Sequence, residues 1–196
     1  LTEIPTTTEP LSAEVLRGKT LFNAAADPRL SQGSWISCAS CHPDGGSDGV
    51  TWIFPDGPRQ TPQLWNAAQT LPWHWSAALD EAQDVEETIQ LIQHGLGLAP
   101  GADPAQLGAP NAGRSADLDA LAAYLQQGIR IPNLPPPSPA ATTGREIFVR
   151  SGCAACHGGA NWTTSRLPGL AGTLDQDSNG MVDEMLHEVG TRNPLD

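Results

Sequence analysis

The sequence predicts an all-α protein of two loop-rich domains, the second of them incomplete. The pattern Cys-x-x-Cys-His occurs once in each half of the 196-residue chain. Amphipathic helices are predicted on both sides of the first copy but only ahead of the second. Charged residues make up 16% of the chain, and 20 Gly and 18 Pro indicate many loops and short helices instead of long regular elements.

The first predicted domain, residues 1–131, begins and ends with a helix. Ser12 is placed to cap the opening helix. Its expected apolar face consists of Val15, Leu16, Leu21 and Phe22. Ser115 is placed to cap the closing helix, which should end at Gly128. Its apolar side consists of Leu118, Leu121, Ala122 and Leu125. Between them, a third helix is predicted from Asp84 to about His94.

A proline-rich linker is predicted over residues 132–140. Its sequence, PNLPPPSPA, favours a stiff extended chain. The second predicted domain, residues 141–196, opens with a helix from Thr143 to Arg150 that leads into the second motif. No closing amphipathic helix is predicted after it, so we expect another chain, a second copy or a longer form of the protein to complete this domain.

All four cysteines belong to the repeated motif, which is typical of covalent haem attachment. Two thiols on one helical turn reach the two vinyl groups at one haem edge, and the histidine that follows ligates the iron. The sequence therefore predicts two haem c groups in a cytochrome c-type protein. Their attachment residues and proximal ligands are Cys38, Cys41 and His42 for haem 1, and Cys153, Cys156 and His157 for haem 2.

Three other uses of the motif explain less. A zinc site would have to join the two motifs across an interval far longer than usual ligand spacings. A thioredoxin-like redox pair needs a βαβ context, which the predicted helices do not provide. A disulfide within each motif would leave both histidines without a role.

The sixth iron ligand of haem 1 is predicted to be a histidine. Both methionines of the chain lie in the second predicted domain, so the first has none to offer. His74, between two tryptophans, is the first choice, and a packed structural role is its alternative. His94 is the second choice, although at a helix end it would also interact with the helix dipole.

The sixth ligand of haem 2 has three candidates within the chain, His187, Met181 and Met185. The alternatives are core packing for the methionines and a surface loop for His187. A ligand from outside this chain is a further alternative, because the second domain is expected to be incomplete.

A calcium loop is predicted at residues 175–183. Their sequence, DQDSNGMVD, fits the first nine positions of an EF-type loop. The candidate ligands are Asp175, Asp177, Asn179, Met181 through its carbonyl, and Asp183. Leu186 occupies the twelfth position, where a bidentate Glu is usual, so Glu184 or Glu188 would have to replace it. An acidic solvated turn is the alternative.

The acidic composition narrows the range of partners. A formal net charge of −12 argues against nucleic acid and anionic membrane surfaces, and it favours a redox partner protein with a basic surface. No transmembrane segment is predicted, because no run of about 18 apolar residues occurs. Haem attachment of this type takes place outside the cytoplasm. We therefore expect a periplasmic or extracellular protein, processed or excised at Leu1.

Several segments resemble the bacterial dihaem cytochrome c peroxidase and MauG family, in the branch often fused behind β-propeller domains. GKTLF at 18–22 is similar to the family's helix before the first haem, and GPRQTPQL at 57–64 to its G-P-R-N-x-P-T-L segment. HEVGT at 187–191 is like its H-D-V-G-T. The resemblance implies that Trp75 corresponds to the family tryptophan between the haems. A place in the wall of the haem pocket is the alternative for Trp75.

The chain departs from this family around the first haem. The family's exchangeable histidine before G-P-R-N has no counterpart in WIFPD at 52–56. The family's acidic residue beyond the tryptophan has no assigned counterpart among Asp80, Glu81, Asp84 and Glu86. MauG-like relatives use a tyrosine as a haem ligand. Tyr124, the only tyrosine here, falls on the closing helix and is predicted to be structural.

Three functions remain. The chain would be a dihaem cytochrome that passes single electrons between redox partners, a hydrogen-peroxide-reducing enzyme in which haem 2 feeds haem 1, or a haem-bearing subunit of a larger redox assembly. The sequence favours electron transfer, because a peroxidase needs an open iron and an acid–base group. Ligation by His74 would close the iron.

If His74 supplies the sixth ligand, haem 1 is a six-coordinate, low-spin haem. The ferric protein should then give a low-spin EPR signal from haem 1, because two imidazoles occupy both axial positions. An axial high-spin signal from haem 1 would contradict the prediction.

Overall fold

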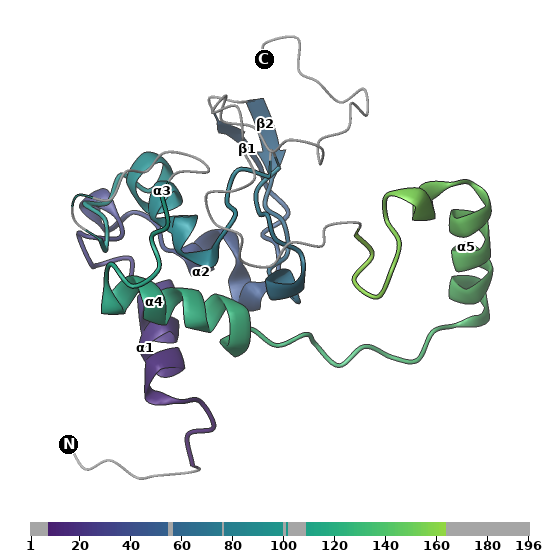
Figure 1. Ribbon diagram of the computed structural model, residues 1–196, viewed down its shortest axis with the longest axis horizontal. Coiled ribbons are helices and arrows are strands. Elements are labelled where there is room, and N and C mark those ends of the chain that lie inside the picture. The colour runs from purple at the N-terminus through teal and green to yellow at the C-terminus, as the bar shows by residue number, and fades with distance from the viewer. Residues whose placement is uncertain (1–7, 55–56, 76, 100, 102–108, 164–196) are drawn as a thin grey trace.

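The computed structural model describes residues 8–54, 57–75, 77–99, 101 and 109–163. The described chain is mostly helical with long loops, as the sequence predicted (Figure 1). Its longer helices are α1 (Ala13–Phe22), α4 (Ala116–Ala123) and α5 (Pro139–Arg150). The shorter helices are η1 (Gln32–Ser34), α2 (Cys38–Cys41), η2 (Pro43–Gly45), η3 (Ala67–Gln69), η4 (Ala82–Asp84), α3 (Val85–Glu87), η5 (Thr88–Ile92), η6 (Tyr124–Gly128) and η7 (Cys153–Ala155).

One antiparallel hairpin departs from the all-α prediction within the described residues. Strand β1 (Thr51–Phe54) pairs with β2 (Gly57–Gln60), with Thr51 opposite Gln60 and Phe54 opposite Gly57. β1 alternates exposed and half-buried residues, which is the period-two pattern of a strand lying on a surface. The hairpin follows the first Cys-x-x-Cys-His motif and lies above the helical body (Figure 1).

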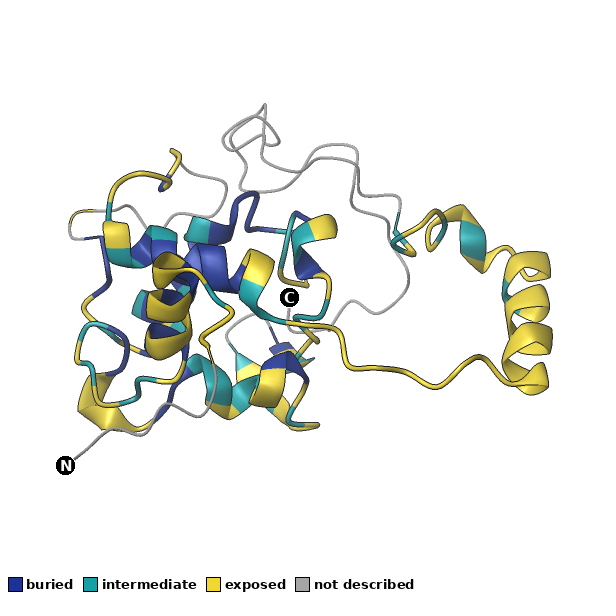
Figure 2. Cartoon of the chain, turned by 90° about the horizontal axis from the view of Figure 1, so that it is seen from below, coloured by how far each residue is buried: buried dark blue, intermediate teal, exposed yellow. Residues whose placement is uncertain are grey.

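Helices α1 and α4 pack together and form the centre of the core. Ser12 Oγ accepts a hydrogen bond from Val15 N at 3.2 Å, and Ser115 Oγ accepts one from Leu118 N at 3.4 Å, so both predicted caps are confirmed. The core cluster contains Val15, Leu21, Phe22, Leu30, Ile89, Leu98, Leu118, Leu121, Tyr124 and Leu125, among others. Figure 2 shows the buried residues gathered in this part of the molecule.

The buried face of α1 differs from the predicted one at two positions. Leu16 is 38% exposed, so its assignment to the apolar face was wrong, whereas Gly18 is buried. A Cβ placed on Gly18 would overlap the carbonyl oxygen of Ala120 in α4. The glycine therefore permits close approach of the two helix backbones, and apolar periodicity cannot detect such a contact.

Aromatic packing closes the same interface. The rings of Phe22 and Tyr124 meet edge to face, with centroids 5.2 Å apart. Burial raises the pKa of the Tyr124 hydroxyl above its ordinary value. The structural role predicted for Tyr124 is therefore confirmed by its packing.

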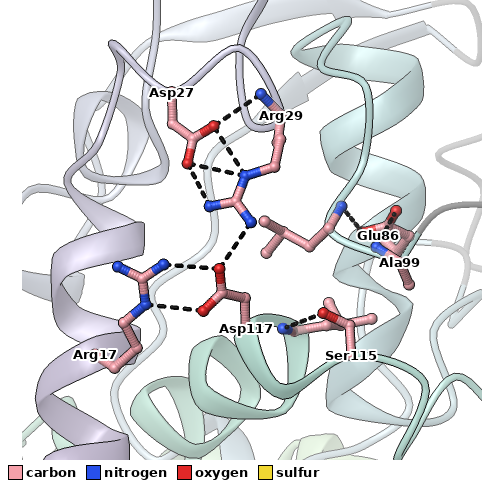
Figure 3. Close-up of polar contacts among 9 residues, drawn as sticks. Arg17, Asp27, Arg29, Glu86, Ala99, Ser115 and Asp117 are labelled. Atoms are coloured by element: carbon pink, nitrogen blue, oxygen red, sulfur yellow. Dashed lines mark hydrogen bonds and ion pairs between the residues drawn. The ribbon is translucent and has the colours of Figure 1, made fainter.

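A charged cluster joins α1, α4 and the turn after α1 (Figure 3). Arg17 binds Asp117 through two hydrogen bonds of 2.7 and 2.8 Å, and Arg29 binds the same carboxylate at 2.8 Å. Arg29 also pairs with Asp27 at 2.7 Å. The hydrogen bonds from Arg17, with those from Arg29, lower the pKa of Asp117 to about 2. The cluster stays ionised across the neutral range and fixes the turn at residues 27–29 against α4.

The third predicted helix forms in a different shape. A 3₁₀ turn, η4, leads into α3, which continues as the π-helical turn η5 and stops at Gln93. The closing helix likewise continues from α4 into the π-helical η6, which ends at Gly128 as predicted. π-helical turns are rare in proteins and are frequent at functional sites.

The helix that opens the second predicted domain begins earlier than the sequence predicted. Residues 130–138 are exposed and lack regular secondary structure, whereas α5 starts at Pro139 instead of Thr143. Ser138 caps α5 by accepting a hydrogen bond from Ala141 N at 3.2 Å, and Pro139 suits the first helical position. None of the residues of α5 is buried (Figure 2). The division at residues 131 and 141 stays a prediction.

Gly18→Ala should destabilise the protein, because the added methyl group forces the two helix backbones apart. Overpacking of this kind costs about 1–3 kcal/mol in the free energy of unfolding, measured by chemical denaturation. Gly144→Ala in α5 is the matched control, since no atom lies within 4 Å of the added Cβ. That control should be neutral or stabilising by about 0.5–1 kcal/mol. Equal effects at both positions would contradict the close-packing role of Gly18.

Candidate haem-binding site

The first Cys-x-x-Cys-His motif forms one helical turn. Cys38 and Cys41 begin and end α2, and His42 N donates to Cys38 O at 2.9 Å. Ser37 N donates to Ser40 Oγ at 3.1 Å, which closes the start of the turn. All four cysteines are free, which agrees with haem attachment and not with a disulfide in either motif. No cluster of three or more metal-binding side chains occurs among the described residues.

The imidazole of His42 has the chemistry required of an iron ligand. Burial lowers its pKa, while the nearby backbone of Gly46 and Pro62 partly opposes the shift. The ring is therefore neutral at physiological pH, the form that ligates a metal. Its Nδ1 is buried and has no hydrogen-bond partner in the part of the chain that is described. The residues present fit a haem ligated by His42.

The two thiols of the first motif are poor thiolates. Burial raises the pKa of Cys38, and burial with the charge of Asp48 raises the pKa of Cys41 to about 11. Neither side chain is suited to redox thiol chemistry, which relies on a lowered pKa. Both are suited to a permanent thioether, in which the sulfur no longer titrates.

His74 lies in a strained loop at the surface. Its backbone has a φ of +67°, a region that residues other than glycine rarely adopt. The side chain is exposed, and its Nε2 lies 3.3 Å from Thr88 Oγ1 at the start of η5. The packed structural alternative does not hold for this exposed ring. Ligation of the haem 1 iron by His74 stays a prediction.

The other predicted residues of haem 1 are also exposed. His94 has a φ of +53° and pairs with Ser31 through an isolated β-bridge. Trp75 is 62% exposed, and its Nε1 donates to Gln60 O at 3.0 Å. Both roles, second-choice ligand for His94 and inter-haem residue for Trp75, stay predictions.

Buried carboxylates follow this loop, and their burial is not apparent from the sequence. Five of the eight residues from 80 to 87 are acidic, a density typical of a solvated surface. In the structure all five are buried, namely Asp80, Glu81, Asp84, Glu86 and Glu87. The interleaved Ala82 and Val85 were the available signal, because they place part of this segment against the core.

Asp84 is a buried carboxyl group with a pKa near neutrality. Its oxygens accept hydrogen bonds from Glu81 N and Asn111 Nδ2, both at 3.1 Å. Burial, with smaller contributions from Glu81 and Asp80, raises its pKa to about 7. Glu81 also accepts from the backbone of Asn111. The pair ties η4 to the segment that leads into α4.

Glu86 has a structural role in the same segment. It is 0% exposed and accepts hydrogen bonds from Leu98 N at 2.9 Å and Ala99 N at 3.2 Å (Figure 3). Gln90 Nε2 donates to it at 2.8 Å. These donors satisfy a buried carboxylate, which would otherwise cost a large desolvation free energy.

The second motif lies on the protein surface. Cys153, Cys156 and His157 are exposed, and His157 N donates to Cys153 O at 2.9 Å, as in the first motif. Phe148 of α5 lies 6.4 Å from the His157 ring, between centroids, and 5.4 Å from Trp162. Among the described residues, Phe148 therefore places an aromatic ring beside the second motif, and Trp162 packs against that ring.

The remaining predicted ligands lie outside the described residues. These are the haem 2 candidates Met181, Met185 and His187, and the calcium candidates Asp175, Asp177, Asn179, Met181 and Asp183. Haem 2 ligation and calcium binding by these residues stay predictions.

The family model for di-haem cytochrome c peroxidase matches residues 12–127, which span both helices of the core and the first haem motif. The chain belongs to this family. The resemblance to the dihaem cytochrome c peroxidase and MauG family is therefore confirmed. This is a haem c family, and both cysteine pairs of the expected attachment motifs are present in the chain.

Two curated relatives extend the comparison. The chain is 28% identical to cytochrome c551 peroxidase of Pseudomonas aeruginosa over 176 residues, which cover 74% of this chain and 50% of that protein. It is 35% identical to methylamine utilization protein MauG of Methylorubrum extorquens over 113 residues, which cover 48% of this chain and 31% of that protein. The chain thus spans half or less of these relatives.

A solved structure shares the fold. Hydrazine synthase from Kuenenia stuttgartiensis superposes with a TM-score of 0.52 over 79% of this chain and 51% of that chain, at 21% identity. None of the described helices is both long and apolar enough to cross a membrane.

The raised pKa of Asp84 predicts a pH-dependent stability. Because folding favours the protonated carboxyl, its contribution is complete below about pH 4, the unfolded pKa, and is lost as the pH rises towards 7. The free energy of unfolding, measured by urea titration between pH 4 and 7, should decline with a slope that Asp84→Asn reduces. Asp117→Asn is the control, because the pKa of Asp117 lies below this window. An unchanged slope in Asp84→Asn would contradict the assignment.

Proposed function

We propose that this chain is the haem-bearing part of a periplasmic or extracellular enzyme that reduces hydrogen peroxide. The reaction consumes one peroxide, two electrons and two protons and yields two waters. The family match over residues 12–127 and the similarity to a cytochrome c551 peroxidase support this function over simple electron transfer. Bound haem supplies the iron at which the O–O bond is cleaved.

The state of His74 carries the proposal. A peroxidase must free one axial position of the iron, so its distal ligand has to be displaceable. His74 is exposed, sits at a positive φ and is hydrogen bonded to Thr88. Strained backbone at an exposed loop is a common property of functional sites. If His74 holds the iron of bound haem 1, its place on an exposed loop would allow it to be displaced without disrupting the core.

Asp84 is the proposed source of protons. With a pKa of about 7, its carboxyl group holds a proton in part of the molecules at neutral pH and exchanges it readily. It lies on the segment that follows the His74 loop, in the stretch where the family has an acidic residue. Glu81 and Glu86 each accept hydrogen bonds from two backbone amides, whereas Asp84 accepts from one, so the two glutamates are less suited to this role.

Electrons would enter from a basic redox partner and pass from haem 2 to haem 1, with Trp75 as the intermediate residue. The net charge of −12 favours electrostatic encounter with such a partner. In this scheme, residues 1–131 and 141–196 are the two haem domains, and further polypeptide completes the second. Calcium at residues 175–183 would brace the second domain.

Electron transfer without peroxide chemistry is the second candidate. The observation that favours it is the presence of His74 and His94 as candidate sixth ligands of haem 1. An iron that such a histidine ligates firmly offers no position for peroxide. Turnover separates the two functions directly. The haem-loaded protein should oxidise many equivalents of a reduced cytochrome donor only when hydrogen peroxide is added as the terminal oxidant. Donor oxidation that stops at one electron per haem and is not extended by peroxide would establish the electron carrier instead.

His74→Ala should make peroxide binding faster. Removing a displaceable ligand opens the iron, so the second-order rate constant with peroxide should rise by about tenfold or more, equivalent to at least about 1.4 kcal/mol. Stopped-flow absorption measures the rate constant, and a high-spin ferric spectrum should accompany it. His94→Ala, another exposed histidine at positive φ, is the control and should leave both unchanged. A response in His94→Ala alone would assign the ligand to His94.

A further inference from the structure

Gln93 is a buried polar residue to which neither the attachment motif nor the proposed function gives a role. It is 5% exposed, and its Nε2 lies 3.7 Å from Cys38 Sγ, within hydrogen-bonding range of sulfur. Its Oε1 is buried and has no hydrogen-bond partner within the described chain. A buried amide oxygen without a partner destabilises the folded state, so this placement is not neutral for stability.

Hydrogen bonds to the backbone N–H and C=O of Gln93 fix the position of its side-chain amide. Gln93 N donates to Thr88 O at 3.1 Å and so ends the π-helical turn η5. Gln93 O accepts from Gln32 N at 3.2 Å and from Trp35 Nε1 at 3.4 Å. Both donors belong to the segment that leads into α2. Gln93 therefore links η5 to the haem-attachment turn, and its side chain is directed at the first attachment cysteine.

Haem attachment settles which way the amide faces. A thioether sulfur carries no proton, so it accepts a hydrogen bond but cannot donate one. The amide must then present its NH₂ group to Cys38 Sγ. We propose that Gln93 is a positioning residue for haem 1, which donates a hydrogen bond to the Cys38 thioether and thereby raises the reduction potential of that haem.

The direction of the shift in the haem 1 reduction potential follows from electrostatics. A donor at the sulfur draws electron density away from the haem edge and so favours the reduced iron. The second motif has no equivalent contact among the described residues, and Cys153 is exposed. The hydrogen bond therefore makes the two haems unequal and raises haem 1 relative to haem 2. The inference rests on haem attachment at Cys38 and holds whether or not the protein reduces peroxide.

Two substitutions test this role in the full haem-loaded chain. Gln93→Glu keeps the shape but removes the NH₂ group and adds negative charge. Gln93→Leu removes the whole amide, and with it the donor, without adding charge. Spectroelectrochemical titration should resolve two reduction steps, and only the haem 1 step should move to lower potential, further in Gln93→Glu than in Gln93→Leu. Gln93→Glu retains the volume of the native side chain and keeps the test valid where Gln93→Leu fails to fold.

Gln83→Leu is the matched control. Gln83 Nε2 donates to Asp119 Oδ1 at 2.9 Å, so the variant also removes one glutamine hydrogen bond but none at a cysteine. Both reduction steps should stay at the wild-type potentials in this control. Unchanged haem 1 potentials in both Gln93 variants would overturn the proposal. A shift of the same size in Gln83→Leu would also overturn it, because the effect would then be general loss of packing.

Discussion

The close approach of α1 and α4 at Gly18 is the contact on which the helical core depends. Without a side chain at Gly18, the helix backbones come together, and Leu21, Phe22 and Tyr124 close the core around them. The ion cluster of Arg17, Arg29 and Asp117 holds the turn after α1 against α4. The segment leaving that turn reaches α2 with its position already fixed, so the haem motif is anchored from its N-terminal side.

The same arrangement separates rigid from displaceable parts of the site. His42 is half-buried with its Nδ1 enclosed, whereas His74 is exposed on a strained loop. The acidic segment between that loop and η5 is internal and is held by amide donors from other elements. If His74 ligates the iron as proposed, haem 1 would have one fixed and one movable ligand. With a carboxyl group of neutral-range pKa nearby in sequence, that arrangement would suit proton-coupled reduction better than electron transfer alone.

The helix caps and the haem motifs were predictable from the sequence because they depend on local chemistry. Ser12 and Ser115 act on their own first helical turns, and the two haem motifs are complete within five residues, so no tertiary information was needed. Gly18, Asp84 and Gln93 were not predictable, because their roles depend on neighbours distant in sequence. Gly18 contacts α4, Asp84 contacts Asn111, and Gln93 contacts Cys38. Leu16 was misplaced for the same reason, since apolar character alone does not show which residues of a helix meet a partner.

The π-helical turn η5 determines which side chain faces the haem motif. Its hydrogen bond from Gln93 N to Thr88 O encloses one more residue than an α-helical turn would. Loss of a single residue from this turn would favour regular α-helix and rotate the following side chain by roughly 100° about the axis. The amide beside Cys38 would then be replaced by another group. The turn lies partly at the surface, where Leu91 is exposed. Its length is nevertheless constrained like that of a core element, because the position of the Gln93 amide depends on it.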